Sequence, residues 1–392
     1  MKEIVLAGAV RTPVGRFGGG LSETPATQLG AIAIKESLKR AKVSPDQVEY
    51  AIMGNVLTAN EGQAPARQAA IRAGIPDSVS ALTINKVCAS GLMSVALAAQ
   101  AIKAGDADVV VAGGMENMSL TPHMIVNSRT GFRLGDVQAI DHMVHDGLWC
   151  PFENRHMGSS AEAIAAKHGI SREEQDAFAL RSHQRAIAAM REGVFSGEIV
   201  PVEIKRKKET VLLDKDEGPR PDTTDTTLRT LRPAFPPGQS VTAGNASQIS
   251  DGAASIVVME SARARSIGAN VMAKLTGYAH AANAPAWLFD APVLATRKLL
   301  EKTRTKLEDY DLIEVNEAFA AQILANAKEL HWDWSKVNIH GGAIAIGHPI
   351  GASGARVLVT LLHSMQRQKA KRGMAVICHG GGGAVAVAVE SV

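Results

Sequence analysis

The sequence predicts an α/β fold made of two duplicated halves with a long insertion between them. Two observations lead to this prediction. First, 46% of the 392 residues are hydrophobic but only 4% are aromatic, so small aliphatic residues must build the core, which favours buried parallel strands and closely packed helices. Second, short motifs recur in the same order near both ends of the chain. At about 100–200 residues per domain, the length favours two or three units.

The repeat is clearest around an Ala-Ser-Gly triplet, which occurs at 89–91 and again at 352–354. Each triplet precedes a helix-like stretch and then an apolar, strand-like run. The stretches are 92–104 and 109–112 in the first copy, and 355–368 and 374–378 in the second. Helices that connect strands in this way predict layered α/β units with right-handed crossovers.

Matches continue upstream of both triplets. Apolar runs that end at Asn55 and Asn316 correspond, and the opening strand 3–9 corresponds to 271–279. Each half therefore reads as a β-α-β-α-β unit. We expect an N-terminal half made of 1–118 plus 241–269, a C-terminal half made of 270–392, and an inserted loop domain at 119–240.

The insertion is rich in His, Met, Pro, Thr and charged residues. Helical patterns are present at 159–168 and 173–192, and Ser171 with Glu174 predicts a capping box before the second helix. Long insertions of this kind often carry binding functions. A basic run at 205–208 could attract phosphate, although such a run is usually a solvated face.

Composition argues against several classes of protein. The 42 Lys and Arg against 39 Asp and Glu leave a net charge of +3, too small to indicate nucleic acid as a partner. Three cysteines cannot form a disulfide framework in a chain of this size, which favours a reducing, cytoplasmic compartment. The first residues lack a signal-peptide pattern, and we find no apolar run of 18 residues, so no membrane span is expected.

Two further classes of site are disfavoured. The spacing of His142, His145, Cys150 and His156 fits no familiar four-ligand pattern, so we expect no metal. The glycines at 380–383 lack the Lys-Ser/Thr of a P-loop and the strand-first context of a dinucleotide fingerprint, which argues against nucleotide hydrolysis or NAD use.

Two cysteines lie where reactive groups are expected. Cys88 precedes the helix 92–104, whose N-terminal amides stabilise a thiolate and lower its pKa. Cys378 ends a strand and is followed by His379 and four glycines, whose amides can point at an anion. Taken alone, each is more commonly a small buried hydrophobe.

Two polar residues are further candidates for a functional site. His348 lies among small residues, and Pro349 disfavours helical geometry before it, so the imidazole sits in a stiff loop that a substrate could approach. A satisfied core histidine is the alternative. Asn316 follows the strand 312–315, at the kind of strand end where α/β folds form binding crevices. It could equally be the N-cap of the next helix.

Together these motifs resemble the thiolase family over essentially the whole chain. The matching blocks share one order in the family and are 85–91, 241–247, 316–319, 341–356 and 378–383. The resemblance implies the thiolase fold, with two duplicated halves in a five-layer α-β-α-β-α core, an inserted loop domain, and assembly as a dimer or a dimer of dimers.

The resemblance also implies roles. Cys88 would take the acyl group, His348 would activate it, and Cys378 would act as acid and base. Asn316 would hold a water, and the amide of Gly380 would bind an oxyanion. The substrates would be coenzyme A thioesters, with no further cofactor and no metal. The positions that match the family's coenzyme A contacts are Leu148, His156, Met157, Arg220, Phe235, Ala243, Ser247, Ala318 and Phe319.

Within the family, residues 88–91 and Gly158 look most like the branch that condenses two acetyl-CoA to acetoacetyl-CoA. Two stretches depart from the family pattern. His379 replaces a residue that is commonly aliphatic, and 288–292 differs in a stretch that borders the family's acyl pocket. A degradative 3-ketoacyl-CoA thiolase of broader specificity is therefore the alternative, and a non-catalytic acyl-CoA or lipid-binding protein of the same fold is a third reading.

Overall fold

A computed structural model describes residues 2–205 and 209–392, and in this part of the chain ten strands form one large sheet. Their order is β14-β15-β16-β13-β1-β12-β5-β3-β4, and β2 pairs with β12. The bounds are Ile4–Arg11 (β1), Gly15–Arg16 (β2), Tyr50–Gly54 (β3), Ser80–Ile84 (β4), Val109–Asn117 (β5), Ser250–Glu260 (β12), Val271–Ala282 (β13), Leu312–Val315 (β14), Arg372–His379 (β15) and Gly383–Ser391 (β16).

Helices alternate with these strands in both halves. In the first half they are Ala26–Ala41 (α1), Pro65–Arg72 (α2) and Ser90–Ala104 (α3), with a 3₁₀ turn at Pro45–Gln47 (η1). In the second half they are Ala291–Thr303 (α8), Ala320–Leu330 (α9), Ala343–Ile346 (α10) and Ile350–Gln368 (α11), with 3₁₀ turns at Pro285–Asp290 (η5) and Leu307–Asp309 (η6). Ser261–Ser266 (α7) joins β12 to β13.

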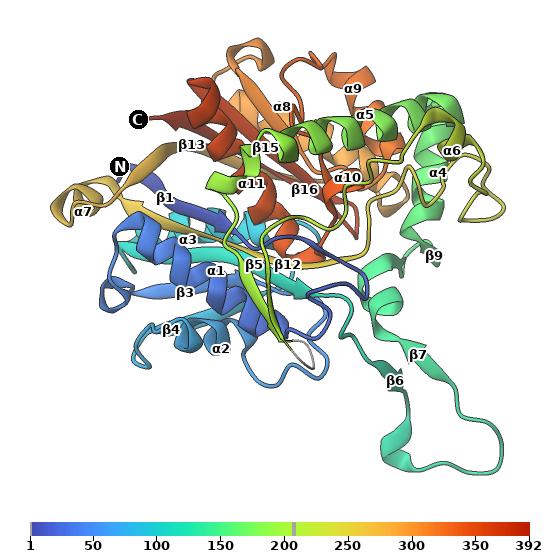
Figure 1. Cartoon of the computed structure of the whole chain (residues 1–392), viewed down its shortest axis with the longest axis horizontal. Coiled ribbons are helices and arrows are strands. Elements are labelled where there is room, and N and C mark those ends of the chain that lie inside the picture. The colour runs from blue at the N-terminus through green and yellow to red at the C-terminus, as the bar shows by residue number, and fades with distance from the viewer. Residues whose placement is uncertain (1, 206–208) are drawn as a thin grey trace.

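The elements stack in five layers (Figure 1). Helices α3 and α11 pack against each other between the two parts of the sheet, α1 and α2 cover one outer face, and α8 and α9 cover the other. Side chains alternate along β16, where Val385 and Val387 join the central core while Ala384 and Ala386 face the outer helices. Small alanines on the outer side let the helices approach closely. The predicted α-β-α-β-α architecture is confirmed.

The sheet is mixed, although the composition favoured parallel strands. β3 pairs in parallel with β4 and β5, and β14 pairs in parallel with β15, as helical crossovers require. The pairs β1–β12, β5–β12, β1–β13, β13–β16 and β15–β16 are antiparallel. The glycine turn at 380–382 explains one of these pairs, because a connection that short joins only antiparallel neighbours.

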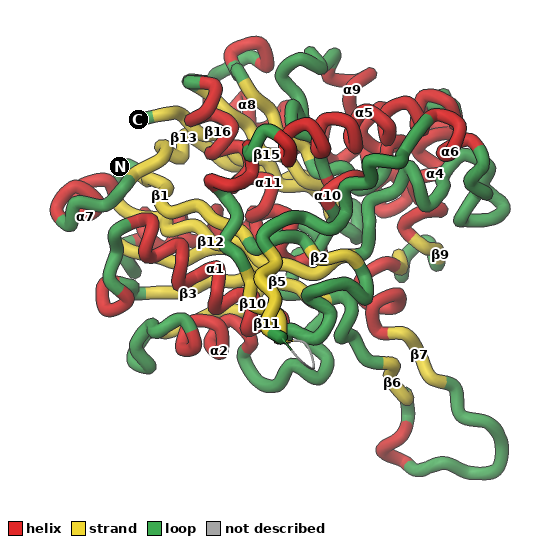
Figure 2. Tube along the Cα trace, in the orientation of Figure 1, coloured by secondary structure: helices red, strands yellow, loops and turns green. Residues whose placement is uncertain are grey.

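The inserted segment forms a covering layer and a protruding arm. The arm contains the antiparallel pair His123–Ile125 (β6) and Ala139–Asp141 (β7), with a 3₁₀ turn at Ser128–Thr130 (η2), and extends away from the body (Figures 1 and 2). The remaining elements are Met143–Leu148 (η3, a π-helix), Trp149–Cys150 (β8), Arg155–His156 (β9), Met157–His168 (α4), Arg172–Arg191 (α5), Val194–Gly197 (η4), Val202–Lys205 (β10), Thr210–Leu213 (β11) and Asp225–Arg229 (α6).

Two expectations about the insertion can be compared with the structure. The capping box is confirmed, because Ser171 Oγ accepts a hydrogen bond from the Glu174 amide at 3.1 Å and Glu174 Oε2 accepts one from the Ser171 amide at 2.6 Å. The basic run at 205–208 lies outside the described residues except for Lys205.

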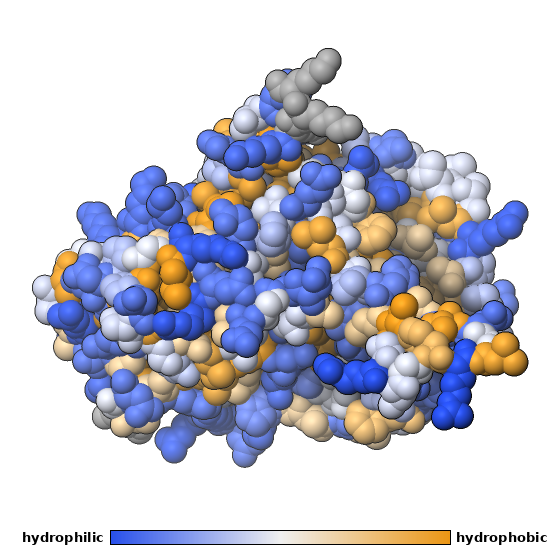
Figure 3. Space-filling model, turned by 90° about the horizontal axis from the view of Figure 1, so that it is seen from below, coloured by the Kyte–Doolittle hydropathy of each residue, from blue (hydrophilic) through white to orange (hydrophobic). Residues whose placement is uncertain are grey.

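Figure 3 shows the face of the molecule that points downward in Figure 1. Polar and apolar patches alternate on this face (Figure 3).

Residues 87–104 are long and apolar enough, by length and composition, to cross a membrane. The expectation that no such stretch exists is therefore wrong. In the structure 56% of this segment is buried, and α3, which it contains, occupies the central helix layer between the two parts of the sheet. A core helix shielded on several sides needs apolar residues on nearly every face.

Candidate active site

A cavity of about 670 Å³ opens where the inserted segment meets both halves of the core. Cys88 comes from the first half, and His348 and Cys378 come from the second. Helices α3 and α11, which begin just after Cys88 and His348, pack against each other, and Gly380, in the turn after Cys378, lies next to the Val87 side chain. The structure thus brings together three side chains that are far apart in the sequence.

Cys88 lies two residues before α3. Val87 has a positive φ of 47°, and Ser90 Oγ holds the turn by donating to the Val87 carbonyl at 2.6 Å and accepting from the Lys86 amide at 2.8 Å. Burial raises the pKa of the Cys88 thiol to about 12, and the amides of Gly380 and Cys88 oppose only part of this effect. The helix N-terminus was expected to lower this pKa, but burial has the larger effect, so the neutral thiol predominates and needs a base.

His348 lines the same cavity and is the candidate for that base. Its amide donates to the Gln248 carbonyl at 3.0 Å, and its Nδ1 lies 2.6 Å from Ser353 Oγ. The hydroxyl of Ser353 donates its proton to the Pro349 carbonyl at 2.8 Å, so Ser353 Oγ must accept from Nδ1–H. Nε2 is therefore the unprotonated nitrogen. Burial, with a smaller effect of Arg356, lowers the pKa of His348 to about 3, which keeps the imidazole neutral near pH 7.

Cys378 is the second thiol in the cavity. It is buried at the end of β15, and burial, followed by the nearby Cys88, raises its pKa well above the ordinary value. The turn after it depends on glycine, because Gly381 and Gly382 have φ values of 84° and 99°. That turn leaves the Gly380 amide directed at Cys88.

Asn316 differs from the other predicted residues. It is fully buried and is not among the residues that line the cavity. Its Oδ1 lies 3.4 Å from Arg356 Nη2, while its Nδ2 has no hydrogen-bond partner in the described part of the chain. The N-cap interpretation is wrong, because α9 begins at Ala320 with Phe319 as N-cap. An unpaired buried amide donor is costly unless it binds water or substrate.

All nine residues predicted to contact coenzyme A line the cavity, namely Leu148, His156, Met157, Arg220, Phe235, Ala243, Ser247, Ala318 and Phe319. The His156 and Phe235 rings stack with centroids 4.7 Å apart, and Phe235 meets Phe319 edge-on at 6.3 Å. Gly158 is required beside this stack, since a Cβ there would lie 2.2 Å from the Phe235 ring.

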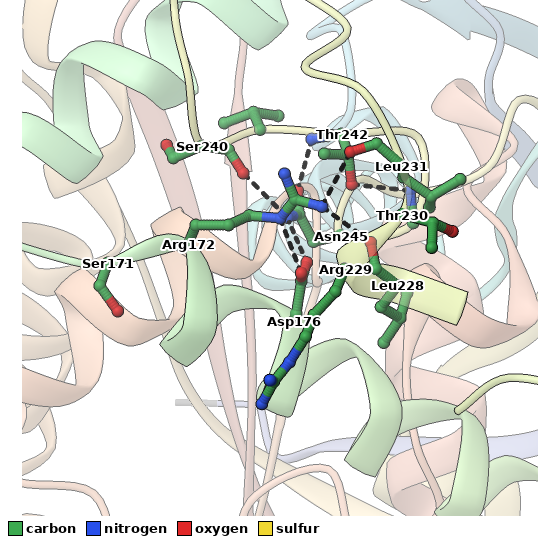
Figure 4. Close-up of polar contacts among 12 residues, drawn as sticks. Ser171, Arg172, Asp176, Leu228, Arg229, Thr230, Leu231, Ser240, Thr242 and Asn245 are labelled. Atoms are coloured by element: carbon green, nitrogen blue, oxygen red, sulfur yellow. Dashed lines mark hydrogen bonds and ion pairs between the residues drawn. The ribbon is translucent and has the colours of Figure 1, made fainter. Parts of the chain in front are cut away.

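A polar network holds the segment that carries Ala243 and Ser247 (Figure 4). Arg172 donates to Asp176 at 2.7 Å and to the carbonyls of Leu228 and Leu231 at 2.7 and 3.0 Å. Asn245 donates from Nδ2 to Asp176 at 2.9 Å and to the Ser240 carbonyl at 3.0 Å, and its Oδ1 accepts from the Thr242 amide at 2.8 Å. Helix α5 therefore anchors this side of the cavity.

Sequence reasoning missed three residues with functional positions. Arg16 and Phe17 line the cavity, and Phe17 is 56% exposed. The sequence feature that could have indicated these two residues is a Phe next to an Arg in a glycine-rich stretch. Glu116 is buried and accepts hydrogen bonds from the amides of Leu57 at 3.0 Å and Gly351 at 2.7 Å, so it ties the start of α11 to the first half. No pattern in the sequence marked Glu116.

The four candidate metal ligands, His142, His145, Cys150 and His156, do not gather. Within residues 2–205 and 209–392, no group of three His, Cys, Asp or Glu side chains is arranged to hold a metal ion.

Known proteins match the whole chain. Residues 4–262 match the family model for the thiolase N-terminal domain, and residues 269–391 match that for the thiolase C-terminal domain. Curated relatives include an acetyl-CoA acetyltransferase of Pseudomonas aeruginosa, 53% identical over 388 residues with 99% of both chains covered, and one of Cupriavidus necator, 53% identical over 391 residues with 100% covered. The crystal structure of the Bacillus anthracis acetyl-CoA acetyltransferase superposes with a TM-score of 0.98 at 42% identity, covering 100% of this chain and 99% of that one.

Proposed function

The chain belongs to the thiolase family, and on that premise we propose that it is an acetyl-CoA C-acetyltransferase, which condenses two acetyl-CoA to acetoacetyl-CoA and CoA and cleaves acetoacetyl-CoA in reverse. The observation that supports this proposal is one cavity holding two thiols and a neutral imidazole. The reaction needs such a set, because it combines a covalent acyl transfer with proton abstraction from carbon.

In the first half-reaction, His348 Nε2 takes the proton of the Cys88 thiol as the sulfur attacks the thioester carbon of acetyl-CoA. The carbon–sulfur bond to CoA then breaks, and the CoA sulfur takes the proton back from His348. The products are acetyl-Cys88 and CoA. A neutral histidine can accept this proton, whereas a protonated one could not.

In the second half-reaction, Cys378 acts as a base. Cys378 first gives its own proton to His348, and the thiolate so formed removes a proton from the methyl carbon of a second acetyl-CoA. The resulting enolate attacks the carbonyl carbon of acetyl-Cys88. The bond to the Cys88 sulfur breaks, which releases acetoacetyl-CoA, and His348 gives its proton to Cys88 while Cys378 keeps the proton taken from the methyl group. The two thiols thus play opposite roles, one as nucleophile and the other as acid and base.

Both steps place negative charge on a thioester oxygen. We assign one oxyanion site to the amides of Cys88 and Gly380, both of which lower the pKa of the Cys88 thiol. The other would consist of His348 and a water bound by Asn316, whose Nδ2 is a buried donor without a partner in the described residues. Removing one such donor typically lowers the rate by about 10²–10³-fold.

The inserted segment would bind coenzyme A. Arg220 lies among the lining residues and supplies positive charge for phosphate or adenine contacts. The stacked rings of His156 and Phe235, with Met157 and Leu148, offer an apolar channel for the pantetheine arm. Under this proposal the coenzyme A thioesters are substrates, and no additional cofactor or metal takes part.

We also propose that the protein forms a homodimer or homotetramer. Leu82 on the edge strand β4 is 40% exposed, and an exposed edge strand favours pairing with another chain. On the arm, Phe132 and Leu134 are exposed as well. Association of copies would remove this apolar surface from water.

The test is thiolysis of 3-ketoacyl-CoAs from four to sixteen carbons, with mass spectrometry of acyl adducts. We expect the highest kcat/KM with acetoacetyl-CoA and an acetyl adduct on Cys88. Cys88→Ser should lose the adduct and turnover, while Cys378→Ser should keep the adduct and lose condensation. Cys150→Ser is the matched control, because Cys150 is buried outside the cavity.

Other outcomes would favour the alternatives. A long-chain optimum would indicate a degradative thiolase, and binding of acyl-CoA without any turnover would indicate a binding protein. An adduct that forms equally well on the Cys88→Ser protein would show that Cys88 is not the nucleophile.

A further inference from the structure

The cavity is closed on one side by a wall of aromatic and aliphatic side chains from η5. Leu288 and Phe289 are 1% and 3% exposed, and both line the cavity. The Phe289 ring meets Phe319 edge-on, with centroids 5.5 Å apart and planes at 67°. Both rings belong to the same apolar cluster as Cys378, and η5 contacts β15, the strand that carries this second thiol.

Several polar contacts hold this wall in place. Asn326 Nδ2 donates to the Phe289 carbonyl at 2.7 Å. The next residue, Asp290, pairs with Lys167 at 2.6 Å and with His168 at 2.8 Å, which ties η5 to α4 of the inserted segment. Arg155 Nη2 adds a bond to the Ala286 carbonyl at 3.0 Å. A segment held from two sides by α4 and α9 cannot move aside cheaply for a longer ligand.

The position of the wall defines what it would touch. The stacked pair His156 and Phe235 comes from the inserted segment, which the proposed function assigns to coenzyme A. The wall comes from the core and lies beside Cys378. An acyl group attached at Cys88 must therefore fit into the space that remains between the two thiols and the Phe289–Phe319 pair.

We infer that Phe289 is a specificity-determining residue that restricts the acyl group to two or three carbons by filling the space a longer chain would need. The inference rests on the proposed function for the reaction and adds the residue that sets chain length. A pocket that excludes one methylene discriminates by about 10- to 200-fold. The butanoyl group from 3-ketohexanoyl-CoA exceeds the limit by one or two methylenes, so the pocket should clearly favour acetoacetyl-CoA.

The experiment compares Phe289→Ala and Phe289→Leu with the unmodified protein, using acetoacetyl-CoA, 3-ketohexanoyl-CoA and 3-ketooctanoyl-CoA. We expect the ratio of kcat/KM for six carbons to that for four to rise at least 10-fold in Phe289→Ala, and to rise less in Phe289→Leu. Phe195→Ala is the matched control, because Phe195 is also 3% exposed but lies in a cluster outside the cavity. Its ratio should not change.

A second readout does not require turnover. The affinity of hexanoyl-CoA, measured by calorimetry, should increase in Phe289→Ala relative to acetyl-CoA, and not in Phe195→Ala. An unchanged ratio and an unchanged relative affinity in a folded Phe289→Ala protein would overturn the inference, as would equal cleavage of four- and eight-carbon substrates by the unmodified protein. Absence of all cleavage would instead refute the proposed function, and the binding measurement would still decide the role of Phe289. If Phe289→Ala fails to fold, Phe289→Leu carries both measurements.

Discussion

The carboxylate of Asp216 joins the inserted segment to the first strand through a buried ion pair. Arg11 Nη1 and Nη2 lie 2.6 and 2.9 Å from its two oxygens, and the Val14 amide donates to Asp216 Oδ1 at 2.8 Å. Arg11 also pairs with Glu198 at 2.6 Å. Arg11 is fully buried and both acids are nearly so. We predict that changing Asp216 destabilises the whole protein.

The expected loss in the free energy of unfolding follows from the buried charge of Arg11, which remains after Asp216 is changed. Asp216→Asn preserves the shape but leaves a buried guanidinium with a single carboxylate, and breaking a buried pair in this way costs about 3–5 kcal/mol in the free energy of unfolding. Asp216→Ala also leaves the Val14 amide without its acceptor, which adds about 1–3 kcal/mol. Arg11 stays charged at every accessible pH, so the loss should not be relieved between pH 6 and pH 9.

The assay is urea unfolding followed by circular dichroism, at fixed protein concentration. Asp225→Asn is the matched control, because Asp225 pairs with Arg229 at 2.9 Å with both side chains more than half exposed. That change should alter the free energy of unfolding by less than about 1 kcal/mol. If Asp216→Asn lies within 1 kcal/mol of this control, the buried pair does not stabilise the fold and the reasoning is wrong.

Three further predictions concern the cavity. Because burial raises the pKa of Cys88 to about 12, the neutral thiol dominates below that pH, and the rate of Cys88 alkylation by iodoacetamide should rise about tenfold per pH unit between pH 7 and 10 without a plateau. Gly158→Ala should raise the KM for acetyl-CoA at least several-fold, since its Cβ would lie 2.2 Å from the Phe235 ring. Gly347→Ala should lower kcat by about 10²-fold or more, because Gly347 has a φ of 117° and belongs to the loop that carries His348. Steady-state kinetics measure the KM of the first variant and the kcat of the second.

Each of these has an outcome that would contradict it. A plateau in alkylation near pH 8 would mean that the helix N-terminus outweighs burial at Cys88. An unchanged KM in Gly158→Ala would show that the Phe235 ring can move without loss of binding. For Gly347→Ala, normal kcat in a folded protein would mean that the backbone before His348 is not strained. Gly105→Ala is a control for backbone strain, because Gly105 also has a positive φ, 91°, but no atom within 4 Å of the added Cβ.

Much of the site could be predicted from local patterns. His348 is indicated by the small residues and the proline around it, Cys88 by its place before a helix and Cys378 by the glycines that follow it. The catalytic roles of the two cysteines follow only from the resemblance to the thiolase family. The strand 312–315 was predicted with its observed bounds, since a short apolar run between polar turns has few alternatives. The repeat of helix and strand around the Ala-Ser-Gly triplets predicted the layered architecture for the same reason.

Local patterns could not predict the charge states. A helix N-terminus favours the thiolate, but the degree of burial around Cys88 depends on residues from the second half of the chain, and burial has the larger effect. The tautomer of His348 depends on Ser353, whose proton is already used by the Pro349 carbonyl. Which residues line a cavity, and which surround a group, is decided by packing between distant segments.

The sequence by itself predicted two related α/β halves, an insertion and three candidate catalytic side chains in loops at element ends, because these features depend on periodicity and on neighbours in the chain. Only the tertiary structure decided that the central strands pair antiparallel, that Asn316 is buried outside the cavity lining rather than at a helix cap, and that Phe289 joins the apolar cluster of Cys378. These features depend on contacts across hundreds of residues, where burial and shape, rather than local propensity, determine the energy.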